Sequence, residues 1–365
     1  MADRGRKVAG ALRGAKDSIK AKTETLRSRV GRGSRRRLAA KDAEIASLRR
    51  ELARARGDHG DGLGPAGSPV FFVVGQQKSG TTWLMRTLDA HPEILCRGEG
   101  RFFGADWRQK SLVKSDAMRP PSTLLYALRE AEYLRLWVER SVWSRNDGAD
   151  EHLDNLARMA VDYFLQGELA KTGKRLVGDK SPLLTPETVQ EISAVYPEAR
   201  LIHIIRDGRD SAVSAAHHAR NFGRARGAKQ EDDGLFEEAQ IRKLAADWNA
   251  RVGRTVEDGP RLFGDRYAEV RYEDLLARPE REMARLLRFL GAASDEGSAG
   301  RCVAAASFER LSRGRTRGEE DPSSFFRKGV AGDWRDAFTE RDRRIFEEEA
   351  GDLLKKLGYG EIGAS

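Results

Sequence analysis

Cysteine is nearly absent from this sequence of 365 residues, which holds only Cys96 and Cys302. So distant a pair supports neither a disulfide framework nor a four-ligand zinc site, and a reducing cytoplasm is the simplest compartment to expect. Long apolar runs are lacking as well, so no membrane-spanning helix is expected, and the basic N-terminus lacks the apolar segment of a secretory signal. Because there is no HExxH motif and no acidic triplet, we expect no metal site.

Acidic residues are scarce at the start of the chain. The first 56 residues hold 18 Lys and Arg against 6 Asp and Glu, whereas the rest of the chain holds 48 against 51. The net charge of +9 therefore belongs to the N-terminal segment. The slightly acidic remainder argues against specific binding of nucleic acid. A basic segment of this kind suits contact with an anionic membrane surface.

The N-terminal segment has an organisation of its own. Residues 1–37 are polar and basic, which favours disorder or a fraying helix. Apolar residues then follow a coiled-coil spacing at Leu38, Ile45, Leu48, Leu52 and Ala55. This short helix either joins two chains in a homodimer or remains a solvated amphipathic helix. A linker rich in Gly and Pro follows, so we divide the chain into a basic arm, residues 1–67, and a main domain, residues 68–365.

Apolar runs alternate with helical patterns in the main domain. Strands are expected at Val70–Val74, Leu201–Ile205, Arg175–Val177 and Ala268–Tyr272. Helical patterns cover residues 82–88, 154–169 and 240–255. This alternation predicts an α/β fold of three layers, in which a parallel sheet is flanked by helices on both faces. The polar stretch 220–234 is typical of a long flexible loop or lid.

One loop carries the strongest functional signal. Val73 to Leu84 reads VVGQQKSGTTWL, in which a predicted strand enters a loop bounded by Gly75 and Gly80 before a helix begins. Backbone N–H groups at such a helix start bind anions, and Lys78 adds a positive charge. A Walker A loop would place its Lys after the final Gly. The sequence therefore predicts a P-loop-like phosphate site that differs from that of an ATPase.

Four segments, in the same order along the chain, resemble the bacterial-type PAPS-dependent sulfotransferases, where PAPS is 3′-phosphoadenosine 5′-phosphosulfate. They are QKSGTTWL from Gln77, LIHIIRDGRDSAVS from Leu201, VRYEDLLARPE from Val270 and FFRKGVAGDW from Phe325. The resemblance covers roughly residues 69–358 and leaves out the basic arm. It implies a fold like that of the P-loop NTPases, with PAPS as the co-substrate.

PAPS is anionic at both ends of one nucleoside, so it requires two anion sites. By resemblance, the residues that bind the 5′-phosphosulfate are Gln77, Lys78, Ser79, Gly80, Thr81 and Thr82. Those that bind the 3′-phosphate are Arg206, Ser214, Arg327, Lys328 and Gly329. The adenine is expected to stack on Trp83, with Tyr272 beside it. Arg206 follows a predicted strand, where open α/β sheets place their ligands, and its planar guanidinium suits a phosphate.

Sulfuryl transfer requires a group that stabilises the leaving oxygen and a base for the acceptor. Lys78 is the candidate for the first task. The segment that contains Glu99 resembles the carbohydrate-modifying branch of the family, which implies Glu99 as the base, although Arg101 departs from that pattern. The segment GDKSP resembles one of the same branch in which a lysine, here Lys180, reaches the reacting groups.

Four histidines compete with Glu99 for the role of base, because histidine titrates in the useful range. His217 and His218 remain alternatives that face the acceptor. His91 precedes a proline in a turn and His203 lies inside a predicted strand, so both are expected to be structural.

The predicted activity is transfer of a sulfuryl group from PAPS to a hydroxyl or amine, with release of PAP. The sequence does not identify the acceptor: a carbohydrate, a glycolipid, a lipid or another small metabolite all remain open. One alternative is a P-loop-type kinase for a nucleotide or small molecule, but the lysine of the GK[ST] motif is missing. Another is a non-catalytic basic coiled-coil adaptor with a vestigial nucleotide fold, which would have no need of Lys78, Arg206 and Arg327 together.

Overall fold

The computed structural model describes residues 69–104, 123–144, 148–183, 185–224, 235–321 and 323–360. The predicted basic arm, with its coiled-coil helix, lies outside these residues, as does the part 225–234 of the predicted lid. In the described parts of the chain, no helix combines the length and the apolar character that a membrane span requires.

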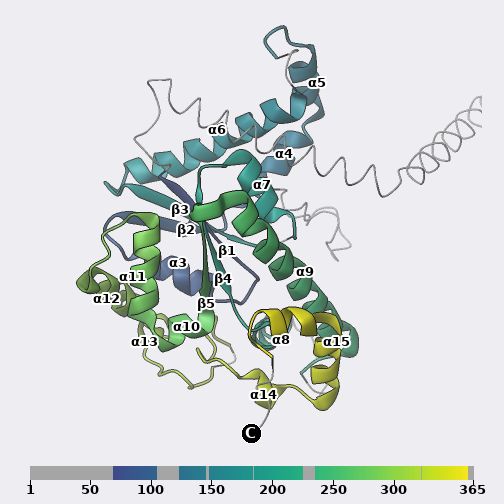
Figure 1. The fold of residues 1–365 in the computed structure, drawn as a ribbon, viewed down its shortest axis with the longest axis vertical. Coiled ribbons are helices and arrows are strands. Elements are labelled where there is room, and N and C mark those ends of the chain that lie inside the picture. Colours follow the sequence, from purple (N-terminus) through teal and green to yellow (C-terminus); the bar gives the residue numbers. More distant parts are fainter. Residues whose placement is uncertain are drawn as a thin grey trace, which may run out of the picture. The chain divides into compact units, whose positions relative to one another are not determined.

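Five parallel strands form one sheet in the described residues, in the order β2-β3-β1-β4-β5 (Figure 1). They are β1 (Val70–Gly75), β2 (Ile94–Gly98), β3 (Leu176–Pro182), β4 (Arg200–Ile205) and β5 (Tyr267–Arg271). The central strand β1 pairs with β3 on one side and with β4 on the other. The order of strands reverses between β1 and β4, and ligands of open α/β sheets bind at the carboxyl ends of such a pair.

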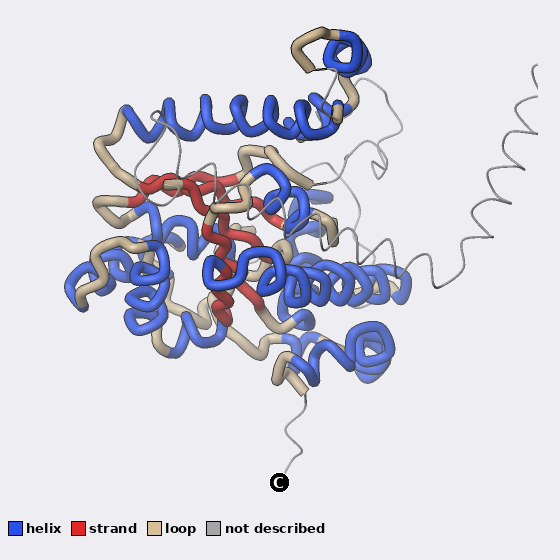
Figure 2. Tube along the Cα trace, turned by 45° about the horizontal axis from the view of Figure 1, so that its top comes forward, coloured by secondary structure: helices blue, strands red, loops and turns tan. Residues whose placement is uncertain are grey.

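Helices connect the strands and cover both faces of the sheet (Figure 2). They are α3 (Thr81–Asp89), α4 (Leu124–Arg129), α5 (Glu132–Arg140), α6 (Ala149–Ala170), α7 (Thr188–Val195), α8 (Gly208–Arg224), α9 (Glu238–Phe263), α10 (Tyr272–Ala277), α11 (Pro279–Leu290), α12 (Glu296–Ala305), α13 (Phe308–Leu311), α14 (Trp334–Ala337) and α15 (Glu340–Lys356), with a 3₁₀ turn η3 at Gly264–Arg266.

The side chains of β1 alternate between two apolar cores. Phe72 packs in a core that includes residues of α6 and α7, whereas Phe71 and Val73 pack in one that includes residues of α3 and α11. Successive residues of a strand point to opposite faces, so a strand that is covered on both faces is apolar throughout. A third core joins α8, α9 and α15 beside the end of β4.

The predicted three-layer α/β fold is confirmed, with strands at Val70–Gly75 and Arg200–Ile205 as expected. The prediction was wrong about β3, which continues through Lys180 instead of ending at Val177, because ionic and hydrogen-bond partners allow polar residues to be buried there. It was also wrong about Tyr272, which begins α10 rather than ending a strand. The short strand β2 was not predicted.

Candidate active site

The loop after β1 presents backbone donors to a pocket. Its turn is closed by a hydrogen bond from Ser79 N to Gln76 O (3.1 Å), and Gly80 precedes α3 with a φ of 94°. A Cβ atom at Gly80 would lie 2.6 Å from the ring of Tyr272, so only glycine fits there. The first turn of α3 contains no acidic residue and its N-cap makes no side-chain hydrogen bond. The backbone N–H groups of this first turn, together with the helix dipole, form an anion site.

Arg206 lies directly after β4 and joins two loops. Its Nη1 donates to the carbonyl oxygen of Lys78 (3.1 Å) and its Nη2 donates to that of Val330 (3.0 Å). The guanidinium lies over the ring of Tyr272, with 4.4 Å from Cζ to the ring centroid. Its Nε is buried and has no hydrogen-bond partner among the described residues. Arg206 thus has a donor left for an anion, and Ser214 lines the same pocket from α8.

The segment that contains Arg327, Lys328 and Gly329 closes the opposite wall. Arg327 Nη1 donates to Glu320 (2.6 Å), its Nη2 pairs with Asp333, and Lys328 Nζ donates to Asp333 Oδ1 (2.6 Å). Arg327 Nε is buried without a partner in the described chain. The two basic side chains are therefore held in place by carboxylates while they line the pocket.

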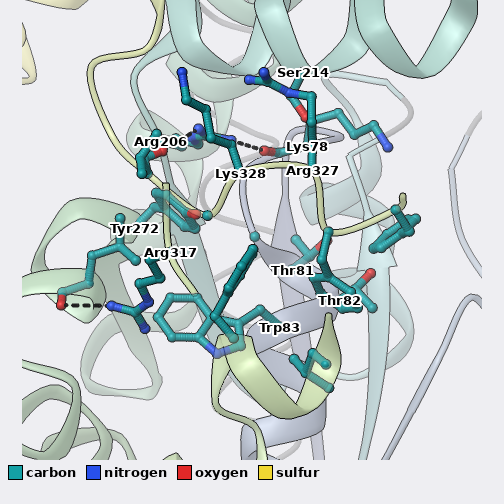
Figure 3. A pocket seen from close by; sticks show the side chains of 18 residues that line it. Lys78, Thr81, Thr82, Trp83, Arg206, Ser214, Tyr272, Arg317, Arg327 and Lys328 are labelled. Carbon is teal, nitrogen blue, oxygen red and sulfur yellow. Dashed lines mark hydrogen bonds between the residues drawn. The ribbon is translucent and has the colours of Figure 1, made fainter. Parts of the chain in front are cut away.

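Aromatic rings line one end of the pocket (Figure 3). Trp83 and Tyr272 meet edge to face with 5.7 Å between ring centroids, and Trp83 Nε1 donates to the carbonyl oxygen of Ala306 (3.0 Å). The guanidinium of Arg317 lies 5.5 Å from the centroid of Trp83. Figure 3 shows Trp83, Tyr272 and Arg317 at one end of the pocket and Arg206, Arg327 and Lys328 at the other. An apolar slot beside a group of basic side chains suits a flat base with charged substituents.

One pocket therefore brings together most of the predicted nucleotide residues. Its empty space, open mouth included, is about 820 Å³, within the range of small-molecule sites. Those that line it are Lys78, Gly80, Thr81, Thr82, Trp83, Arg206, Ser214, Tyr272, Arg327, Lys328 and Gly329. Gln77 is exposed and Ser79 is buried, and neither lines the pocket.

Several lining residues were missed by the sequence reasoning. They are Leu276, Phe308, Leu311, Arg317, Phe325, Phe326 and Val330. Phe325, Phe326 and Val330 lie within the segment FFRKGVAGDW, which could have pointed to them. Nothing in the sequence marks Arg317, which lies in an irregular segment after α13.

The three candidate catalytic residues come from the ends of neighbouring strands. Lys78 follows β1, Lys180 lies in β3, and Glu99 follows β2, in which Gly98 is in register with Lys180. Lys180 Nζ donates to Glu99 Oε1 (2.5 Å), and this ion pair joins a lysine side chain that is 4% exposed to a glutamate that is 58% exposed. The buried Asp179 accepts the N–H of Gly100 (3.0 Å) and so fixes the loop that carries Glu99.

Lys78 is a cation held in a partly apolar position. Burial lowers its pKa to about 8, with Lys180 adding to the effect and Glu99 opposing it. Its Nζ lies over the ring of Phe325, 4.7 Å from the centroid. A lysine in this setting both attracts an anion and releases a proton readily near neutral pH.

The four candidate histidines have different surroundings. The ring of His218 meets Phe325 edge to face at 6.4 Å between centroids, and its pKa is lowered by burial and by Lys78. Burial also lowers the pKa of His217. His91 accepts the N–H of Glu93, and His203, whose pKa burial lowers to about 3, hydrogen-bonds Tyr267. The last two contribute to the structure, and the first two lie on α8 toward the pocket side.

A glycine-bounded anion loop at the switch point of a parallel sheet, with a second basic cluster and an aromatic slot in the same pocket, defines a nucleotide-binding α/β fold of the P-loop type. Residues 69–296 match the model of the sulfotransferase family. The chain therefore belongs to the sulfotransferase family, as the four sequence segments predicted.

Its relatives include protein-tyrosine sulfotransferases. Protein-tyrosine sulfotransferase 2 of Gallus gallus is 24% identical over 231 residues, which cover 61% of this chain and 51% of the relative. Protein-tyrosine sulfotransferase A of Caenorhabditis elegans is 25% identical over 254 residues, which cover 69% and 57%. Sulfotransferase 1A1 of Bos taurus is 23% identical over 198 residues, which cover 47% and 59%. The chain thus spans about half the length of the first of these relatives.

Solved structures of sulfotransferases also resemble the chain. Mouse sulfotransferase SULT7A1 complexed with PAP is 16% identical, with a TM-score of 0.48 and coverage of 81% of this chain and 87% of that chain. Sulfotransferase STF9 from Mycobacterium avium is 16% identical, with a TM-score of 0.41 and coverage of 87% and 84%.

Proposed function

We propose that the protein transfers the sulfuryl group of PAPS to an acceptor hydroxyl and releases PAP. The observation that carries this proposal is that one pocket holds an aromatic slot at one end and, at the other, the basic side chains of Arg206, Arg327 and Lys328 beside the loop of Lys78 (Figure 3). A nucleotide with a single anionic end would use only the loop from Lys78 to Thr82. The second region, with Arg206 and Arg327, suits a further phosphate on the ribose.

The chemical groups of the pocket, as well as their positions, fit PAPS. The uncapped first turn of α3 and the loop glycines accommodate an anionic group against the backbone. The buried Nε atoms of Arg206 and Arg327 have no partner in the described chain and are donors for an anion. The ring of Trp83 offers a face for adenine.

In the proposed transfer, the acceptor oxygen attacks the sulfur in line with the bond to the leaving phosphate oxygen. The new sulfur–oxygen bond forms as the old one breaks, and negative charge grows on the phosphate of PAP. Lys78 stabilises that charge as a cation or by giving its proton. Glu99 takes the proton of the acceptor hydroxyl, and Lys180, paired with it, keeps the carboxylate in position.

For the acceptor, we propose a tyrosyl hydroxyl of a peptide, because two of the relatives named above are protein-tyrosine sulfotransferases. A carbohydrate or a small metabolite, which the sequence left open, is the competing acceptor. Both classes present a hydroxyl, so the chemistry of Lys78, Glu99 and Lys180 is common to them.

Two measurements test the proposal. In thermal unfolding, PAP at about 100 times its dissociation constant should stabilise the chain by roughly 2.7 kcal/mol, whereas ATP and sulfate should give smaller shifts. With radiolabelled PAPS, label should pass to a tyrosine peptide and not to its phenylalanine counterpart. Transfer to sugars alone would overturn the tyrosine assignment and keep the enzyme class. Equal stabilisation by PAP and ATP would overturn the nucleotide assignment.

A further inference from the structure

A buried carboxylate lies behind the second basic region. Asp210, in the first turn of α8, has a fully buried side chain and lies 3.7 Å from Nη2 of Arg206. It accepts the N–H of Gly332 (2.7 Å) through one oxygen and the N–H of Trp334 (3.0 Å) through the other. One side chain therefore contacts both walls of the pocket region that we assign to the 3′-phosphate.

The contacts continue from Asp210 to the basic pair of the opposite wall. Asp333 lies between the two residues whose N–H groups Asp210 holds, and its carboxylate pairs with Arg327 and with Lys328. Arg209, the neighbour of Asp210, stacks on the indole of Trp334 at 3.7 Å from Cζ to the ring centroid. The first turn of α8 thus contacts segment 332–334 through Asp210 and through Arg209. Because Asp333 of that segment pairs with Arg327 and Lys328, the position of the segment determines where these two side chains lie.

Burial of the Asp210 carboxylate makes its contacts energetically important. A buried carboxylate is costly unless charges and donors satisfy it, and removing one partner from such a set is strongly destabilising. Asp210 is satisfied only while segment 332–334 remains docked and Arg206 remains beside it. Since Arg206 itself donates to Val330, the two walls hold each other in register.

We propose that Asp210 is a positioning residue that aims Arg206, Arg327 and Lys328 at one point and so gives the protein its preference for nucleotides with a 3′-phosphate. This inference rests on the proposed function, because it assumes that the pocket binds PAP. It assigns Asp210 no contact with the nucleotide. In the described chain, Asp210 reaches the loop of Lys78 only through Arg206, which donates to the carbonyl oxygen of Lys78, and it accepts no hydrogen bond from the first turn of α3.

The test measures the affinities of PAP and AMP, which differ by the 3′-phosphate, by calorimetric titration of the full chain. Asp210→Asn keeps the shape but loses the charge and one of the two acceptor oxygens. We expect PAP affinity to fall about tenfold, the size of a lost hydrogen bond to a charged group, while AMP affinity falls clearly less, because AMP lacks the phosphate that we assign to Arg206, Arg327 and Lys328. The ratio of the two affinities is insensitive to any fraction of unfolded chain, because that fraction binds neither ligand.

A matched control is Glu191→Gln on α7. Glu191 is also a buried carboxylate that accepts a backbone N–H, that of Gly104 (2.7 Å), and a second donor, the hydroxyl of Tyr126 (2.9 Å), but it lies outside the pocket. It should lose stability as Asp210→Asn does and keep the preference for PAP. A second variant, Asp333→Asn, leaves Asp210 intact and should also lower the preference.

The outcomes separate this inference from the proposed function. A wild-type chain that binds PAP no more tightly than AMP would overturn both. Suppose that the wild-type chain binds PAP more tightly than AMP. If Asp210→Asn keeps that preference, or if Glu191→Gln loses it to the same extent, the role of Asp210 is overturned and the proposed function stands. A rise in preference in Asp333→Asn would show that Asp333 competes with the phosphate, and it would overturn the proposed chain of contacts.

Discussion

Lys78 and Glu99 both have a positive φ, 71° and 62°, which side chains other than glycine seldom adopt. A residue in such a conformation costs of order 1–3 kcal/mol and persists where its surroundings enforce it. Here the surroundings are the hydrogen bond from Arg206 to the carbonyl oxygen of Lys78 and that from Glu99 N to the carbonyl oxygen of Lys180. The strain at both positions is consistent with a site that fixes its charged groups in advance.

At the residue scale, the sequence predicted the site residues that lie in one stretch of chain. It missed those that only the fold brings together. The loop residues from Lys78 to Trp83 could be predicted together because one stretch of chain holds them. Arg317 reaches the pocket from an irregular segment that has no periodicity to reveal its direction. The ion pair between Glu99 and Lys180 depends on β2 and β3 being neighbours, which no local pattern states.

The lowered pKa of Lys78 predicts a pH dependence of nucleotide binding. As pH rises through about 8, the free lysine loses its proton, so PAP affinity should fall above that pH. In Lys78→Arg the guanidinium stays charged, so the decline should be absent over the same range. Calorimetric titration of both proteins between pH 6.5 and about 9.5 measures this difference. Identical profiles would remove Lys78 from the anion site.

Substitution of the proposed base should affect turnover and spare binding. Glu99→Gln keeps the shape of the side chain but cannot take a proton, so kcat should fall roughly 10²–10⁴-fold with PAP affinity nearly unchanged. Glu93→Gln, at the other end of β2 and paired with Arg175, is the matched control and should leave turnover unaltered. Near-normal turnover in Glu99→Gln would direct attention to His217 and His218.

At the scale of elements, the order of strands decides which side chains meet. The carboxyl ends of β2, β3 and β1 are adjacent and carry Glu99, Lys180 and Lys78, and the end of β4 next to β1 carries Arg206. The sequence predicted β1 and β4 because they are continuous apolar runs. It missed β2 because this strand lies at an edge of the sheet and ends in the exposed Arg97 and Gly98, so too few apolar residues remain to mark it.

The junction of the phosphate loop with α3 should tolerate no side chain at Gly80. In Gly80→Ala the positive φ costs roughly 1 kcal/mol, and the new Cβ would meet the ring of Tyr272 at 2.6 Å. We therefore expect a larger loss of stability than φ alone explains, together with weaker PAP binding. Gly291→Ala, at a φ of 74° with open space around it, carries only the conformational cost. Denaturant unfolding and PAP titration of both variants provide the comparison, and equal losses would contradict the predicted clash.

At the scale of the whole molecule, the chain combines parts of opposite charge. The excess of Lys and Arg lies in the first 56 residues, whereas the remainder is slightly acidic. The family match begins at residue 69, after the Gly- and Pro-rich linker predicted from the sequence. The pocket draws all its lining residues from Lys78 onward. Nucleotide binding and contact with anionic surfaces are therefore expected to belong to different parts of the chain.

This division predicts the behaviour of a chain that begins at Ser68. Such a chain should bind PAP as the full chain does, because every pocket residue is retained. It should lose most binding to vesicles of anionic lipid, since each Lys or Arg near such a surface contributes about 1 kcal/mol and the arm carries the basic excess. Binding of the full chain should also weaken as salt rises, because exposed charges are screened. Co-sedimentation with vesicles, PAP titration and light scattering test the two chains side by side, and light scattering also reports whether the arm joins two copies. If the shortened chain bound vesicles as tightly as the full chain, the basic arm would not be the membrane-binding part.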